Sequence, residues 1–129
     1  MRTDFSDEAA WKRVCAAISE PAVDEPVDGF EANVEFVSDP EFEGLKPELL
    51  PELMPDDSQT FAFIVDHITI DEPEHPVLVV DLYNEPGRTF RTISSKMWAV
   101  ENNLSIGNMG FEEFAEAVGR DGVFRGFPE

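Results

Sequence analysis

Cysteine, basic residues and long hydrophobic runs are all scarce in this sequence of 129 residues. The single cysteine, Cys15, excludes an internal disulfide and a zinc site built from cysteines. No apolar run approaches the ~20 residues that a membrane-spanning helix needs. The first eight residues are polar and acidic and do not resemble a signal peptide. We therefore expect a cytoplasmic protein without a membrane segment.

The shortage of basic residues is concentrated in one part of the chain. The sequence has 9 Lys and Arg against 28 Asp and Glu, for a net charge of −19. Between Val14 and Gly87 there are 19 acidic residues and one basic residue, Lys46. Such a field repels nucleic-acid backbones and anionic membranes and attracts cationic partners. Solubility alone is the simpler explanation of the same charge.

The hydrophobic pattern predicts a single α/β domain over residues 1–129. With 42% hydrophobic residues and 11 phenylalanines, the chain can form a core despite its charge. Trp11, Val14 and Ile18 recur at helical spacing after an expected N-cap at Ser6. The element order is β-α-β-α-β-β-β-α-α, which predicts a mixed sheet of about five strands with helices packed on it. The expected strands are 2–5, 32–37, 61–65, 77–83 and 88–93. Besides the helix after Ser6, helices are expected at 47–53, 94–103 and 111–118.

Three stretches of the chain carry a resemblance to a known family. They are residues 2–7 together with Trp11, residues 75–82, and residues 98–106 running on to 108–114. In these stretches the chain resembles a family of small, uncharacterised bacterial proteins that is described only as a domain of unknown function. The likeness spans most of the chain. It implies no activity, because none is assigned to the family.

Four aspartates are expected near strand ends. In open α/β sheets, ligands gather beyond the carboxyl ends of the strands. A hard cation such as Mg²⁺ prefers oxygen ligands, so converging carboxylates there would suit a metal-dependent enzyme. Asp81 also interrupts a buried run, which predicts an ion pair with Arg88 or Arg91 or hydrogen bonds to backbone groups. The candidate metal ligands are Asp4, Asp39, Asp66 and Asp81, and the competing interpretation makes them turn or cap residues.

The acidic region supplies the candidate binding surface. Its charged residues would face a basic partner such as an enzyme covered by an inhibitor or immunity protein, or a DNA-binding groove filled by a nucleic-acid mimic. The asparagines between the last two helices would either cap helices or recognise a ligand. The candidate binding residues are Asp24, Glu25, Asp28, Glu31, Glu35, Asp39, Glu41, Glu43, Asn102, Asn103 and Asn108.

These patterns predict a non-catalytic, acidic interaction module that binds a basic protein and needs no cofactor. We expect no direct binding to nucleic acid or membranes. The first alternative is the small metal-dependent enzyme that uses the strand-end carboxylates. The second is an accessory or oligomeric subunit with an exposed aromatic patch made of Trp98, Phe111, Phe114, Phe124 and Phe127.

Overall fold

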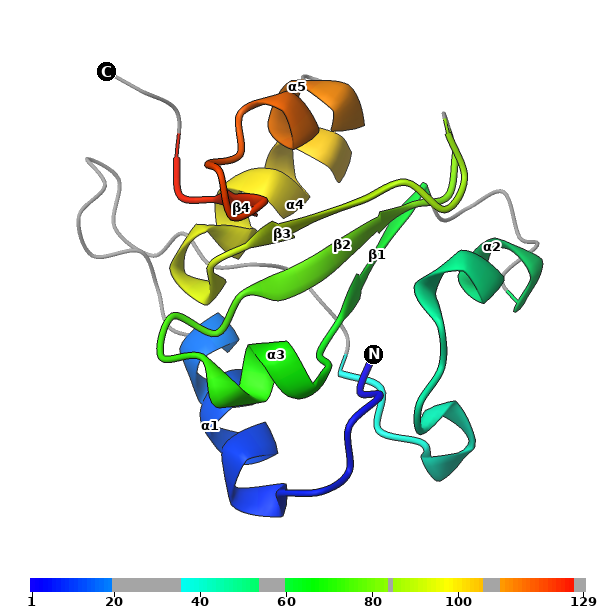
Figure 1. Ribbon diagram of the computed structural model, residues 1–129, viewed down its shortest axis with the longest axis vertical. Coiled ribbons are helices and arrows are strands. Elements are labelled where there is room, and N and C mark those ends of the chain that lie inside the picture. The colour runs from blue at the N-terminus through cyan, green and yellow to red at the C-terminus, as the bar shows by residue number, and fades with distance from the viewer. Residues whose placement is uncertain (20–35, 54–59, 84, 106–109, 127–129) are drawn as a thin grey trace.

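The chain folds around one mixed sheet, shown in Figure 1. The structure is a computed structural model and describes residues 1–19, 36–53, 60–83, 85–105 and 110–126. The strand order follows the chain, with two antiparallel pairs and a final parallel pair. The mixed α/β class is confirmed, although the described sheet has four strands rather than five. The strands are β1 (Phe61–Ile64), β2 (Val77–Asp81), β3 (Thr89–Thr92) and β4 (Val123–Phe124).

The central hairpin forms where the apolar runs predict it. All residues of β2 are buried, as expected for a strand that is apolar up to its last residue, Asp81, and is covered on both faces. The turn that leads into β3 closes with a 2.9 Å hydrogen bond from the Arg88 amide to the Glu85 carbonyl. Gly87 has a φ of 96°, which suits the second middle position of a type II turn. The predicted Pro86-Gly87 turn is therefore confirmed.

Helices cover one face of the sheet. The side chains of Val77 and Val79 point to this face and pack in two clusters. One cluster includes Val14 of α1, and the other includes Val100 and Phe114. The covering helices are α1 (Glu8–Ser19), α4 (Met97–Ser105) and α5 (Phe111–Glu116).

The C-terminal aromatic rings belong to the core. Phe111, Phe114 and Phe124 are all buried, so they cannot form the exposed patch that the accessory-subunit alternative requires. Trp98 is half-buried. Phe127 lies outside the described residues. The three buried rings pack instead against Val79 of β2 and Phe90 of β3.

A different kind of layer lies on the opposite face. The alternate residues Leu78 and Val80, with Ile64, pack against the fully buried Leu50. Leu50 comes from a run of short helical turns, and a proline stands in the first turn of each 3₁₀ helix. The turns are η1 (Pro40–Phe42), η2 (Pro47–Leu49) and α2 (Leu50–Leu53).

Two expectations for the N-terminal half need correction. The predicted strand 2–5 reduces to one parallel bridge between Arg2 and Val65. The Arg2 amide also donates to the Val37 carbonyl at 2.9 Å, but residues 36 and 37 form no strand, and 32–35 lie outside the described residues. The N-cap of α1 is Asp7 rather than Ser6, because the Asp7 carboxylate accepts the Ala10 amide at 3.0 Å.

A helix that the pattern missed follows β1 directly. This helix is α3 (His67–Asp71), and no element was predicted between the expected strands 61–65 and 77–83. Its N-cap is Asp66, which forms a capping box with Thr69. In the described parts of the chain, no helix is both long enough and apolar enough to cross a membrane.

Candidate functional site

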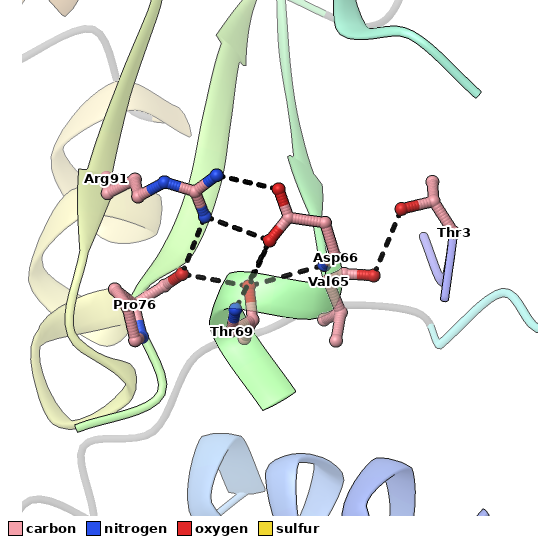
Figure 2. Close-up of polar contacts among 6 residues, drawn as sticks. All are labelled: Thr3, Val65, Asp66, Thr69, Pro76 and Arg91. Atoms are coloured by element: carbon pink, nitrogen blue, oxygen red, sulfur yellow. Dashed lines mark hydrogen bonds and ion pairs between the residues drawn. The ribbon is translucent and has the colours of Figure 1, made fainter. Parts of the chain in front are cut away.

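Asp66 lies at the end of β1 in a closed polar network, drawn in Figure 2. Its Oδ1 accepts the Thr69 amide at 3.2 Å and a hydrogen bond from Arg91 Nη1 at 3.0 Å. Arg91 Nη2 donates to Oδ2 at 2.6 Å, so the guanidinium grips both carboxylate oxygens. Arg91 Nη1 and the Thr69 hydroxyl also donate to the Pro76 carbonyl, at 3.0 and 2.8 Å. The network joins β1, α3 and β3.

The electrostatics of Asp66 favour a structural role. Burial by itself raises the pKa of this carboxyl group, but the hydrogen bonds and the charge of Arg91, together with Thr69, outweigh burial and lower the pKa. Asp66 is therefore ionised and already neutralised by a cation. A metal ion would have to displace Arg91 from the same two oxygens.

Asp81 is buried with 2% of its surface exposed. Its Oδ1 accepts the Tyr83 amide at 2.9 Å, and its Oδ2 accepts the Glu85 amide at 2.8 Å. The predicted backbone hydrogen bonds are thus present. The arginines that were offered as partners pair elsewhere: Arg88 with Glu85, and Arg91 with Asp66.

The other two candidate ligands serve local turns. Asp4 Oδ1 accepts the Ser6 amide at 2.8 Å and the Ser6 hydroxyl at 2.6 Å, and these hydrogen bonds lower the Asp4 pKa. Asp39 caps η1 by accepting the Glu41 amide at 3.1 Å. Within the described ranges, no three His, Cys, Asp or Glu residues lie close enough to hold a metal ion. The metal-enzyme alternative needs the four aspartates to converge on one site. They do not converge, because each carboxylate accepts hydrogen bonds from backbone amides close to it in the chain.

A second group of carboxylates lies on residues 39–52, which we call the acidic segment. It carries five acidic residues and one basic residue, Lys46. The exposed members are Glu41, Glu43, Glu48 and Glu52, and Asp39 is half-buried. Leu50 fixes the segment to the sheet, and the Gly44 amide donates to the Thr3 carbonyl at 2.8 Å. The carboxylates therefore project from turns with defined positions.

The exposed carboxylates of the acidic segment form no ion pair with any described residue. Of the ion pairs between described residues, none involves Glu41, Glu43, Glu48 or Glu52. The arginines that form ion pairs bind carboxylates outside the acidic segment. The pairs are Arg2 with Glu8, Arg88 with Glu85, Arg91 with Asp66, and Arg125 with Glu74 and Asp121. The acidic segment thus carries four exposed carboxylates that form no ion pair within the described parts of the chain.

The family model for a domain of unknown function, DUF6924, matches residues 1–127. The chain belongs to the DUF6924 family. This confirms the resemblance to an uncharacterised family. No curated protein and no solved structure matches the chain. Membership in DUF6924 brings no assigned chemistry.

For this DUF6924 chain, part of the predicted binding set lies outside the described residues, namely Asp24, Glu25, Asp28, Glu31, Glu35 and Asn108. Asn102 is exposed on α4. Asn103 donates from its side chain to the Ala99 carbonyl at 2.8 Å, one turn back in the same helix. Sequence reasoning missed Glu48 and Glu52, although their place in an acidic run beside proline turns was a usable signal.

Proposed function

We propose that this protein is a non-catalytic interaction module of the cytoplasm, which binds a basic protein through its acidic segment. The observation that carries the proposal is the set of exposed carboxylates, Glu41, Glu43, Glu48 and Glu52, which lack a cation of their own. The segment that holds them is anchored by Leu50.

The physical advantage of such a surface lies in the encounter with the partner. Uncompensated charges of one sign raise the rate of association with an oppositely charged surface, and they exclude partners of like charge. Nearby carboxylates also repel one another in the free protein, and a basic partner removes that repulsion. An inhibitor or immunity-like protein and a nucleic-acid mimic would both use the surface in this way.

The proposal is tested by identifying retained proteins at two salt concentrations. The tagged full chain is incubated with lysate of its host, and bound proteins are identified by mass spectrometry. We expect one basic protein to be retained at low salt and released at high salt, since screening weakens exposed charge pairs. Retention that is unchanged by salt would contradict the proposal.

Two matched variants locate the interaction. The test variant carries Glu41→Gln, Glu43→Gln, Glu48→Gln and Glu52→Gln, and the control carries Asp71→Asn, Glu72→Gln, Glu112→Gln and Glu116→Gln. Both remove the same charge, and the control carboxylates lie on α3, at its C-cap and on α5. We expect the association rate with the captured partner to fall about ten-fold or more in the test variant. Equal losses in both variants would mean that only net charge matters.

A further inference from the structure

The turn between β2 and β3 presents one aromatic side chain to solvent. Tyr83 is the only tyrosine of the chain, and 77% of its surface is exposed. This is the largest exposed fraction among the large hydrophobic side chains that the structure describes as exposed. Because most of its surface is exposed, Tyr83 contributes little to the core and is accessible to a binding partner.

The backbone beneath Tyr83 is held by a buried charge. The two oxygens of Asp81 accept the amides of Tyr83 and Glu85, and its carbonyl accepts the Gly87 amide at 2.9 Å. Burying a carboxylate is costly unless its hydrogen bonds are made. Asp81 accepts these hydrogen bonds where the chain turns, and the Tyr83 side chain remains exposed to solvent. The turn therefore presents the ring with little backbone entropy left to lose on binding.

The turn adjoins the acidic segment. Leu82 packs in the same cluster as Leu50 and Leu45, which joins the start of the turn to the acidic segment. Figure 1 shows the turn and α2 at the same end of the molecule. Leu49, next to the anchor Leu50, has 45% of its surface exposed. The turn that carries Tyr83 thus begins next to the acidic segment.

We propose that Tyr83 is the aromatic anchor of the surface that binds the basic partner, and that an arginine or lysine side chain of this partner packs on its ring. This inference rests on the proposed function. A cation over a tyrosine ring is attracted by the ring's quadrupole, and arginine also stacks on it. Tyrosine is enriched at the energetic centres of interfaces, where surrounding contacts exclude water. The nearby carboxylates attract the same cationic side chains, so both features select one partner chemistry.

The experiment titrates a defined cationic probe into the full chain. The probe is a synthetic peptide of about ten arginine residues, measured by calorimetry at low ionic strength, where screening is weak. The variants are Tyr83→Ala, which removes the ring, and Tyr83→Phe, which keeps it. The control is Ile68→Ala, an exposed apolar residue on α3. Thermal unfolding verifies that each variant folds.

Loss of the ring should weaken binding about 3- to 30-fold. Tyr83→Phe and Ile68→Ala should stay within about two-fold of the unmodified protein. Equal affinity for Tyr83→Ala and the unmodified protein would overturn the role of Tyr83 and leave the proposed function standing. Equal losses in Tyr83→Ala and Tyr83→Phe would also overturn it, since the hydroxyl rather than the ring would then matter. If the unmodified protein does not bind the probe, the proposed function fails, and the anchor role fails with it.

Discussion

The two faces of the sheet are covered in different ways. On the helical face, Phe90 and Phe111 meet edge to face at 4.9 Å between ring centroids, and Phe114 and Phe124 do so at 5.1 Å. On the opposite face, short turns are anchored by the single fully buried Leu50. The difference indicates that stability is concentrated on the helical face, which leaves the other face free to carry charge.

Two regions of the surface also differ in how their carboxylates are paired. Near β4, Arg125 lies between Glu74 and Asp121, and its hydrogen bonds lower the pKa of both carboxyl groups. In the acidic segment, Glu41 and Glu43 have no such partner. An arginine thus neutralises the carboxylates near β4, whereas the exposed carboxylates of the acidic segment form no ion pair with other residues that the structure describes.

The largest expected effect comes from truncating one buried hydrophobic side chain on each face of the sheet. Phe114→Ala should lower the free energy of unfolding by about 4 kcal/mol, and Leu50→Ala by about 3 kcal/mol, because both side chains are fully buried. Urea denaturation measures both values. Hydrogen exchange should show that Leu50→Ala mainly releases the amide of Gly44, which is bound to Thr3. A larger loss for Leu50→Ala than for Phe114→Ala would break the comparison.

The next effect concerns the ion pair of Asp66. Asp66→Asn should cost about 2 kcal/mol, because Arg91 loses a charged partner in a mostly buried position. The Asp66 pKa is lowered in the fold, so its stabilisation is complete above the ordinary value of 3.8 and is lost as pH falls through the folded pKa. The difference between the two proteins should therefore shrink in acid. A difference that stays constant down to low pH would contradict the ionic contribution.

A smaller effect involves the amino group of Met1. Burial lowers its pKa from 8.0 to about 6, against an opposing effect of Cys15, and the amine donates to the Phe63 carbonyl at 2.7 Å. The unfolded chain binds this proton more tightly, so stability should rise as pH increases from 6 to 8. The gain should reach about 2 kcal/mol at most. Denaturation at several pH values measures it, and a fall in stability across this window would refute the assignment.

The smallest effect sharpens the contrast of charge. Glu41→Gln combined with Glu43→Gln should change the unfolding free energy by less than about 0.5 kcal/mol, with a stabilising sign, because exposed like charges are removed. Added salt should stabilise the unmodified protein more than this variant. A clear loss of stability in the variant would show that the acidic segment holds the fold together.

The central part of the fold was predictable because local and global signals agree there. The apolar run of β2 and the Pro86-Gly87 turn specify a hairpin with β3 that needs no distant contact. The helix α3 was missed because a five-residue helix has too few positions to show a period. Its capping pair, Asp66 and Thr69, was the readable signal.

The expected site could be read only in part. Strand-end position identified Asp66 and Asp81, but the sequence does not show that Arg91 and backbone amides would take up their oxygens. The acidic segment was identified by charge alone. Which carboxylates remain unpaired depends on where each arginine lies in space, and this is set by long-range packing.

The placement of the first residues has a consequence for folding during synthesis. Thr3 binds the carbonyl of Val65 across 62 positions, as Figure 2 shows, and the Arg2 amide binds Val37. A ribosome that has produced only the first helix has not yet made either partner. Arg2 and Thr3 are therefore synthesised well before their partners and dock only after these have been made. Closing such a long loop costs chain entropy before any contact repays it, and we expect this step to slow the folding of the whole domain.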